Sequence, residues 1–330
     1  MRTATLGASA VRVTTLGFGG APIGSLYQAV DEAVAVGAVT AALRAGVRFF
    51  DTAPHYGLGL SERRLGRALA AWPRAELVVS TKVGRVLVPD PDGASRRDGE
   101  GFAVPATHRR VWDFSRAGVR RSLEASLERL GLDRVDVVLL HDPDHHRREA
   151  VEEAYPALDE LRAQGAVGAI GAGMNQWQML ADLVRHTDLD VVLLAGRYTL
   201  LDQSALDGLL PLCAARGVSV VIGGVFNSGL LATPAPRPDA TYDYAPGPAE
   251  VVARARRVAA VCERHGVALP QAALAFPTAH PAVASVLVGM RSAAEVAENT
   301  ALAARPTPAG LWEELVAEGL LRPDAPVPVP

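Results

Sequence analysis

Lysine is almost absent from this chain of 330 residues, because Lys82 is the single lysine among 33 basic residues. All the other basic residues are arginine, so we expect the one lysine to do something that a guanidinium group cannot. The ammonium group of lysine is a compact charge, and its surroundings can tune its pKa. Lys82 is therefore the first candidate for a functional residue.

A large net charge, abundant cysteine and long apolar runs are also missing. The formal net charge is −3, which gives no electrostatic basis for binding nucleic acid or an anionic membrane. The two cysteines, Cys213 and Cys262, lie in apolar helical patterns, and we expect reduced thiols in a cytoplasmic protein rather than a disulfide. The first residues lack a signal-peptide pattern, and no segment reaches the roughly 18 apolar residues of a membrane span.

Eight short apolar runs alternate with helical patterns along the chain. Uninterrupted, β-branched runs of this kind are typical of parallel strands that are buried on both faces. Eight strand–helix units predict a (β/α)₈ barrel, with an open doubly wound sheet as the alternative. Against the doubly wound sheet, Gly17–Gly20 continues into Ala21-Pro22 and completes no G-x-G-x-x-G motif. The predicted strands are Thr15–Gly20, Val47–Asp51, Leu77–Lys82, Val135–His141, Val167–Gly173, Val191–Ala195, Val218–Gly223 and Ala284–Val288.

The helices and the C-terminal region carry clear end signals. Ser115 is placed to cap a helix whose apolar residues recur every three or four positions as far as Gly131. Residues 311–319 predict an extra helix near the C-terminus. The Pro-rich tail, residues 322–330, is expected to be extended. No domain boundary is apparent, so residues 1–330 are expected to form one domain.

Two further segments stand outside the repeating pattern. Residues 2–5 and 11–14 predict a β-hairpin that closes the bottom of the barrel. The segment Gly84–Phe114, rich in Pro, Gly, Asp and Arg, predicts a long loop after the third strand. Long loops on that face of a barrel commonly carry function.

Polar side chains stand at the ends of three consecutive predicted strands. Asp51, Lys82 and His141 end the second, third and fourth strands, and Tyr56 follows in the loop after Asp51. The carboxyl ends of barrel strands converge on one face, so all four side chains are expected in one pocket. Each residue alone has an ordinary structural explanation, but their joint placement favours a functional site.

The chemistry of this set is proton transfer. A free tyrosine has a pKa of about 10, too high for an efficient base at neutral pH. The ammonium group of Lys82 would favour the phenolate of Tyr56, and Asp51 would keep Lys82 charged and in place. His141 would hydrogen-bond an oxygen of the substrate. The set needs neither a metal ion nor a covalent nucleophile.

Residues near this pocket are candidates for substrate binding. The polar cluster Asp142–His146 follows the fourth strand, and we expect residues at the edge of the pocket rather than metal ligands. For two aromatic residues, Trp112 and Tyr198, simple packing is an equally favoured explanation. The candidate substrate residues are His55, Trp112, Asp142 and Tyr198.

The four polar residues and their order along the chain resemble the aldo-keto reductase superfamily. The resemblance covers essentially the whole chain. It implies a (β/α)₈ barrel and a nicotinamide dinucleotide, NAD or NADP, that binds in an extended form without a Rossmann motif. Tyr56 would be the general acid/base, Lys82 and Asp51 would tune it, and His141 would orient the substrate oxygen.

The resemblance carries the cofactor site over unevenly. Asn175 matches half of the Ser-Asn pair that binds the carboxamide, with Met174 in place of the serine. Ala195 stands where a glutamine is usual, and Gly223 stands where an aromatic residue stacks on the nicotinamide. The implied cofactor-binding residues are Asn175, the loop residues Gly224, Val225, Phe226, Asn227 and Gly229, and Gly289, Arg291, Glu295, Glu298 and Asn299.

Two of these residues bear on the choice between NAD and NADP. A carboxylate at Glu295 would repel a 2′-phosphate and could accept hydrogen bonds from ribose hydroxyls. The guanidinium group of Arg291 would instead attract a phosphate. The balance leans slightly to NAD.

Four segments resemble the aldose 1-dehydrogenase branch of the superfamily: Ala-Pro-His-Tyr-Gly, Gly-Ala-Gly-Met-Asn-Gln-Trp, Ala-Gly-Arg-Tyr-Thr-Leu-Leu-Asp-Gln and Gly-Gly-Val-Phe-Asn-Ser-Gly. This branch oxidises cyclic hemiacetals to lactones. The resemblance implies a small sugar such as L-fucose as substrate, or a pyridoxal-like molecule. The sequence also allows a general aldehyde or ketone reductase, or a non-catalytic cofactor-binding regulator, and it leaves the oligomeric state open.

Overall fold

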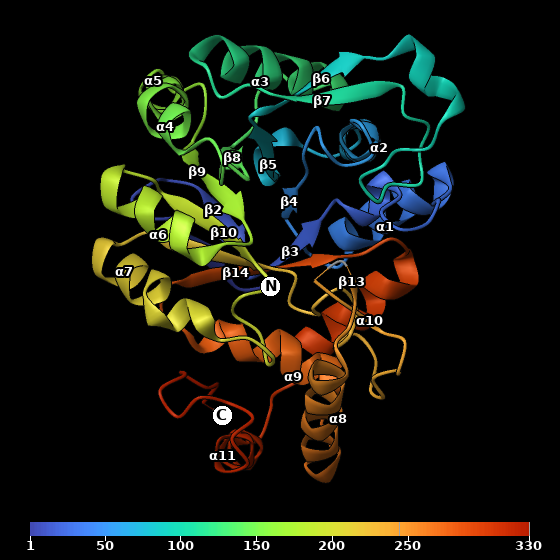
Figure 1. Ribbon diagram of the computed structural model, residues 1–330, viewed down its shortest axis with the longest axis vertical. Helices are drawn as coiled ribbons and strands as arrows, with labels where there is room; N and C mark the ends of the chain where they lie inside the picture. The colour runs from blue at the N-terminus through green and yellow to red at the C-terminus, as the bar shows by residue number, and fades with distance from the viewer. Residues whose placement is uncertain (244, 330) are drawn as a thin grey trace.

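Eight parallel strands close a barrel in the computed structural model, which describes residues 1–243 and 245–329 (Figure 1). Around the barrel the order of the strands is β10, β11, β14, β3, β4, β5, β8 and β9. Each strand overlaps one of the predicted apolar runs, with its ends within two residues of the predicted ones, so the barrel prediction is confirmed. The bounds are β3 (Leu16–Gly19), β4 (Phe49–Asp51), β5 (Val78–Val83), β8 (Val137–His141), β9 (Ala169–Met174), β10 (Val191–Ala195), β11 (Ser219–Gly223) and β14 (Val283–Gly289).

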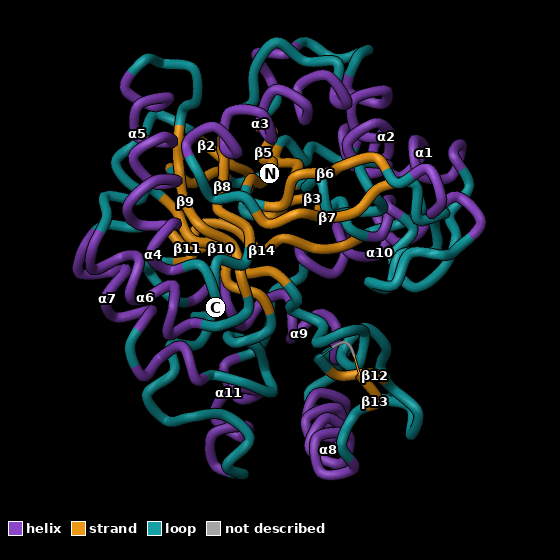
Figure 2. The backbone as a smooth tube through the Cα atoms, turned by 45° about the horizontal axis from the view of Figure 1, so that its top comes forward, coloured by secondary structure: helices purple, strands orange, loops and turns teal. Residues whose placement is uncertain are grey.

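Helices surround the strands, as the purple and orange segments of Figure 2 show. The cap predicted for the helix after Ser115 is confirmed, because the Ser115 hydroxyl accepts a hydrogen bond from the amide of Gly118 at 3.0 Å. Gly131 ends this helix with a φ of 63°. The helices are α1 (Glu32–Arg44), α2 (Leu60–Leu69), α3 (Arg116–Leu130), α4 (Arg147–Glu149), α5 (Tyr155–Ala163), α6 (Trp177–His186), α7 (Leu209–Arg216), α8 (Ala249–Arg264), α9 (Leu269–Ala275), α10 (Ala293–Ala303) and α11 (Ala309–Ala317).

The predicted N-terminal hairpin is confirmed as β1 (Thr3–Thr5) paired antiparallel with β2 (Arg12–Thr14). Its residues Leu6 and Val13 are fully buried and join the apolar cluster inside the barrel, which includes Leu139. The hairpin thus fills the end of the barrel opposite the strand ends that carry the polar residues.

The inserted segment after β5 is more regular than the sequence predicted. It contains β6 (Arg85–Pro89) and β7 (His108–Trp112), which pair antiparallel and run beside α3 at the top of Figure 1. Its central residue Phe102 is buried with Leu58, next to Tyr56. The segment therefore packs onto the loop that carries the tyrosine. A second small hairpin, β12 (Thr241–Tyr242) with β13 (Ala245–Pro246), precedes α8.

The C-terminal region packs back onto the barrel. The predicted extra helix is α11, which contacts α8. The tail forms no helix or strand as far as residue 329, and Pro330 lies outside the described residues. Ala325 is buried, and Arg322 forms ion pairs with Asp207 and Asp324. The tail is thus anchored rather than simply extended away from the protein.

The two cysteines, Cys213 and Cys262, are free and buried. Burial raises the pKa of each thiol to about 12. In the described part of the chain, no helix is both long and apolar enough to cross a membrane.

Replacing Gly66 by alanine is expected to destabilise the fold by about 1–3 kcal/mol. A Cβ atom there would lie 1.9 Å from the carbonyl oxygen of Leu130, where α2 meets the end of α3. Gly37 in α1 is the matched control, because a Cβ atom there meets nothing within 4 Å. Gly37→Ala should leave stability unchanged or raise it by up to about 1 kcal/mol. Urea unfolding of both variants would contradict this packing if the two midpoints moved alike.

Candidate active site

The structure brings Asp51, Tyr56, Lys82 and His141 together at the carboxyl end of the barrel. The ammonium group of Lys82 donates to Asp51 Oδ2 at 2.6 Å, to the Thr52 carbonyl oxygen at 2.9 Å and to the Tyr56 hydroxyl at 3.2 Å. The side chains of Lys82 and Asp51 are each only 2% exposed. The three protons of the ammonium group thus have three acceptors, one of them the phenol.

The pKa values of Lys82 and Tyr56 show how the pair is tuned. Burial works to lower the pKa of Lys82, but Asp51 and Tyr56 outweigh it, so the pKa is raised and the lysine stays charged. Burial raises the pKa of Tyr56, and Lys82 opposes this increase. Lys82 therefore acts in the predicted direction, but burial leaves Tyr56 a neutral phenol at rest. The sequence-based expectation of a phenolate omitted burial.

The loop after β4 holds Tyr56 over this pair. The Tyr56 ring packs against a small buried cluster of Leu58, Phe102 and Val104. The next residue, Gly57, has a φ of 61°, and a Cβ atom there would lie 2.2 Å from the Gly24 carbonyl oxygen. Only glycine fits this turn without strain, so the local sequence directs the phenol toward Lys82.

His141 is buried beside Tyr56, with the ring centroids 5.9 Å apart and the planes nearly perpendicular. Burial lowers the pKa of His141 well below its usual value, and Arg85 and Lys82 lower it further. The ring is therefore neutral and can donate one hydrogen bond through a nitrogen. This is suited to an oxygen atom bound next to Tyr56.

A cleft of about 490 Å³ leads from Tyr56 and Asp51 to the start of α10. Asn175 directly follows β9 and is not among the residues that line this cleft. The role of every lining residue as a cofactor ligand stays a prediction. The predicted cofactor residues in the cleft are Gly224, Val225, Phe226, Asn227, Gly229, Gly289, Arg291, Glu295, Glu298 and Asn299.

The shape of the cleft fits an extended dinucleotide. Small residues line part of the cleft and leave room for a flat ring. They are Gly19, Gly20, Ala195 and Gly223. Its far end reaches the N-terminus of α10, where the helix dipole favours phosphate groups. A flat ring near Tyr56 and a phosphate farther along would both find suitable surroundings.

At the far end, Arg291 and Glu295 are already engaged with each other. The Nε atom of Arg291 lies 3.0 Å from Glu295 Oε1, and the Arg291 amide donates to Glu295 Oε2 at 2.9 Å. The amide of Glu295 in turn donates to the Ser292 hydroxyl, which caps α10. The carboxylate thus neutralises Arg291, the one arginine among the described residues that line the cleft.

The structure separates the four candidate substrate residues. His55 and Asp142 lie beside His141, whereas the Trp112 ring packs under the Arg85 guanidinium group at 4.3 Å. Of the two explanations for Tyr198, lining the pocket or simple packing, the structure favours packing. Its side chain is fully buried outside the barrel against Phe276, at a centroid distance of 5.0 Å. The chain turns outward after β10, and periodicity does not show such a turn.

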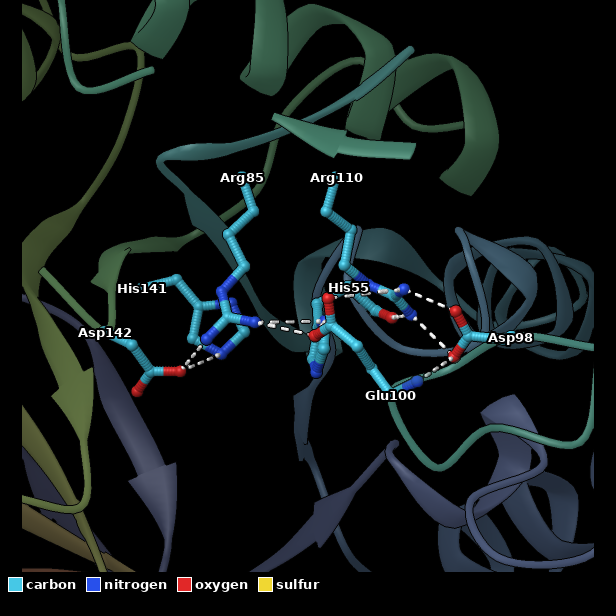
Figure 3. Close-up of polar contacts among 7 residues, drawn as sticks. All are labelled: His55, Arg85, Asp98, Glu100, Arg110, His141 and Asp142. Carbon is cyan, nitrogen blue, oxygen red and sulfur yellow. Dashed lines mark hydrogen bonds and ion pairs between the residues drawn. The ribbon is translucent and has the colours of Figure 1, made fainter. Parts of the chain in front are cut away.

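Several polar residues at this end of the barrel were missed from the sequence. Arg85 contacts Asp142 and His55, and Arg110 donates to the His55 carbonyl oxygen at 3.0 Å (Figure 3). They come from β6 and β7, and the short apolar run Val86-Leu87-Val88 after Arg85 was the available signal for a strand. The other missed residues of the site are Asp98 and Glu100, which pair with these arginines, and Leu26 and Tyr27 in the cleft.

The polar residues after β8 form no recognisable metal site. Within residues 1–243 and 245–329, no group of three or more His, Cys, Asp and Glu side chains is arranged to hold a metal ion. The arrangement instead offers a half-buried phenol, a charged lysine and a neutral imidazole beside a long cleft. Such a set can move a proton to or from an oxygen atom while a bound dinucleotide exchanges a hydride.

The fold and this site together define an oxidoreductase of the barrel type. The model described as "Aldo/keto reductase family" matches residues 15–317, and the chain belongs to the aldo-keto reductase family. Members of this family use a nicotinamide dinucleotide.

Curated relatives match over nearly their full length. The chain is 47% identical to a D-threo-aldose 1-dehydrogenase of Pseudomonas sp, covering 95% of this chain and 96% of the relative. It is 39% identical to a pyridoxal 4-dehydrogenase of Microbacterium luteolum, covering 96% and 97%. It is 34% identical to an L-galactose dehydrogenase of Arabidopsis thaliana, covering 95% and 91%.

Solved structures agree with the fold. An aldo-keto reductase of Bacillus halodurans in its holo form matches with a TM-score of 0.76 and 25% identity, covering 98% of this chain and 97% of the other. A glycerol dehydrogenase of Gluconobacter oxydans matches with a TM-score of 0.77 and 21% identity, covering 99% and 97%. The second match supports the barrel fold alone.

Proposed function

We propose that this protein oxidises the anomeric carbon of a cyclic sugar hemiacetal to a lactone, as an aldose 1-dehydrogenase of the D-threo-aldose (L-fucose) type. The observation that carries the proposal is the contact of Lys82 with the Tyr56 hydroxyl at 3.2 Å, next to a neutral His141. The 47% identity to a D-threo-aldose 1-dehydrogenase supports the choice of substrate class. The free, buried cysteines fit a reducing cytoplasm.

The chain's own residues would move the proton. Tyr56 in its phenolate form accepts the proton of the anomeric hydroxyl, while Lys82 stabilises the phenolate before the transfer. His141 donates a hydrogen bond to the same oxygen as it becomes a carbonyl. A bound nicotinamide dinucleotide would supply the acceptor for the hydride that leaves the anomeric carbon. Carbon–hydrogen and oxygen–hydrogen bonds break, and the carbon–oxygen double bond of the lactone forms.

The rate of sugar oxidation is expected to rise with pH. Because burial raises the pKa of Tyr56, only a small fraction is phenolate at neutral pH, and this fraction grows about tenfold per pH unit below the pKa. Reduction of a carbonyl needs the phenol, which is the dominant form until the pH nears the raised pKa of Tyr56, so the reduction rate should stay level at neutral pH and fall only near that pKa. Profiles of kcat/KM in both directions measure this. Equal, flat profiles would contradict the assignment of Tyr56 as the proton-transfer group.

We further propose that NAD is preferred over NADP. The Glu295 carboxylate forms an ion pair with Arg291, so the guanidinium group is not free for a phosphate. The same carboxylate adds a negative charge where we propose that a 2′-phosphate would bind. Glu295→Gln should free Arg291 and raise the ratio of kcat/KM for NADP to that for NAD by roughly 10–100-fold, since a charge-assisted hydrogen bond is worth about 1.5–3 kcal/mol. Glu298→Gln, in the same cleft, is the control and should change the ratio much less. An unchanged ratio of kcat/KM for NADP to that for NAD in Glu295→Gln would reject Glu295 as the residue that sets the preference for NAD.

A pyridoxal 4-dehydrogenase is the second candidate, favoured by the 39% identity to that enzyme. Purified protein should be given NAD or NADP with L-fucose, L-galactose, D-arabinose or pyridoxal, and the reduced nicotinamide followed by absorbance. Reduction with a sugar at the highest kcat/KM supports the proposal. Reduction with pyridoxal alone selects the second candidate, and reduction with none of them rejects both.

A further inference from the structure

The histidine that precedes Tyr56 lies as close to the tyrosine ring as His141 does. The ring centroid of His55 is 5.9 Å from that of Tyr56 and 5.6 Å from that of His141, and His141 is 5.9 Å from Tyr56. The three rings thus form a nearly equilateral triangle. The proposed reaction uses Tyr56 and His141, and it gives no step to His55, which the sequence marked only as a candidate substrate residue.

Arg85 decides which nitrogen of His55 carries the proton. Its Nη1 atom lies 3.3 Å from His55 Nδ1. Figure 3 draws Arg85 beside His55. A guanidinium group only donates hydrogen bonds, so His55 Nδ1 must be the acceptor. A neutral imidazole then keeps its one proton on Nε2, on the edge of the ring that is turned away from Arg85. His55 therefore offers one N–H donor of defined position.

Arg85 is itself held on several sides. Its guanidinium group lies 4.3 Å from the Trp112 ring centroid, and it forms ion pairs with Asp142 and, at 3.5 Å, with Glu100. Its side chain is only 13% exposed. The hairpin β6–β7 therefore holds the Arg85 guanidinium group in a fixed position next to His55.

The backbone of His55 is fixed from the same hairpin. Arg110 donates to the His55 carbonyl oxygen at 3.0 Å, and an ion pair of 2.6 Å with the buried Asp98 holds Arg110 in place. Both the ring and the backbone of His55 are thus set by arginines of the inserted segment. The position of the Nε2 proton relative to Tyr56 follows from these two contacts.

One neighbour acts against this tautomer. Glu100 Oε2 lies 3.6 Å from His55 Nδ1 and would favour a proton there. This distance is too long for a hydrogen bond, and the Glu100 side chain is 51% exposed. The other charged groups near the ring are Arg85, Arg110 and Lys82. Burial first, and then these three cations, lower the pKa of His55 to about 2, so the ring is neutral.

We propose that His55 Nε2–H is a second hydrogen-bond donor to the substrate, and that Arg85 is the positioning residue that selects this tautomer. This inference rests on the proposed function and narrows its substrate class. Two N–H donors beside one phenol fit a substrate with oxygens on two adjacent carbons. In a cyclic sugar these are the anomeric oxygen, bound by His141, and the neighbouring hydroxyl, bound by His55.

The tautomer can be tested without any turnover. The ¹H–¹⁵N spectrum of the imidazole rings distinguishes the two tautomers, and the signal of His55 among the eight histidines is assigned with His55→Gln. Wild-type protein should show a protonated Nε2 and a bare Nδ1 for His55 across neutral pH. In Arg85→Ala, a fraction with protonated Nδ1 should appear. In Glu100→Gln, the wild-type tautomer should remain. A protonated Nδ1 in the wild-type protein would overturn the proposal, whatever the variants do.

The role in substrate binding needs a pair of substrates. With a sugar and its 2-deoxy analogue, wild-type protein should favour the parent sugar by roughly 10–100-fold in kcat/KM. His55→Phe keeps a flat ring but removes the donor, so this preference should fall to nearly one. A preference that persists in His55→Phe would reject His55 as the donor. If wild-type protein oxidises no sugar, the proposed function fails, while the imidazole spectrum still decides the role of Arg85.

Chemical rescue separates positioning from general structural support. Arg85→Ala should lose roughly 10–100-fold in kcat/KM for the parent sugar, and added guanidinium ion should restore part of it. Arg96→Ala is the matched control, because Arg96 belongs to the same inserted segment and is ion-paired with Asp90 at 3.1 Å. It should keep wild-type activity and show no response to guanidinium. An unaffected Arg85→Ala enzyme, or a loss that guanidinium does not reverse, would contradict the positioning role.

Discussion

Tyr56→Phe is expected to lower kcat for sugar oxidation by roughly 10²–10⁴-fold, the usual contribution of a general acid/base. The variant keeps the aromatic ring, which packs against Phe102, and loses only the hydroxyl that contacts Lys82. The cleft proposed to hold the dinucleotide extends well beyond Tyr56, so the cofactor Kd should change little. Steady-state kinetics and titration of the bound cofactor measure the two effects separately.

The outcome for cofactor binding is as informative as the loss of turnover. If Tyr56→Phe abolished cofactor binding, the tyrosine would be a binding residue and the assignment as a proton-transfer group would be wrong. If turnover stayed near that of the wild type, another group would have to move the proton. Leu58→Ala is a suitable comparison, because Leu58 lies in the same buried cluster and its side chain is apolar. It should change stability far more than the pH profile.

Lys82→Arg is expected to lower kcat/KM by roughly 10²-fold or more, although the charge is kept, because a misplaced catalytic group commonly costs this much. The ammonium group lies between Asp51, Thr52 and Tyr56 at distances of 2.6–3.2 Å, with a side chain only 2% exposed. A planar guanidinium group is larger and cannot reproduce these three contacts from one atom.

The same variant tests why this chain kept a single lysine. Full activity in Lys82→Arg would show that any cation suffices and that the lysine has no special role. Lys82→Met provides the matched comparison, because it removes the charge and leaves the buried Asp51 without its ion pair. It should lose more activity than Lys82→Arg and also lower the melting temperature, since a buried unpaired charge is costly.

The barrel was predictable from the sequence because its strands are buried on both faces and its apolar runs are short and separate. The strand pair in the inserted segment was not, because β6 and β7 are only half-buried and pair across a long irregular stretch. The segment Gly84–Phe114 is rich in Pro, Gly, Asp and Arg, a composition that is typical of loops. The two explanations left open for Tyr198 have a similar origin, since the position of one aromatic residue after a strand does not show on which side of the barrel it packs.

The four polar residues of the site were predictable because strand ends in a barrel converge on one face. The roles of Arg85 and Arg110 were not, since these arginines act across the fold on His55, which lies 30 and 55 positions away in the chain. The direction of the Tyr56 pKa also depends on burial, which the sequence does not show. Local pattern identifies the groups, and tertiary contacts set their protonation.

Transfer of deuterium from the anomeric carbon to the nicotinamide is the direct test of the proposed oxidation. L-Fucose deuterated at this carbon should be incubated with the protein and NAD or NADP, and both products examined by NMR. We expect a sugar lactone without deuterium at that carbon and a reduced nicotinamide that carries the label. Tyr56→Phe should lose this reaction. Deuterium that stays in the sugar, or a labelled nicotinamide formed as fast by Tyr56→Phe, would contradict this expectation.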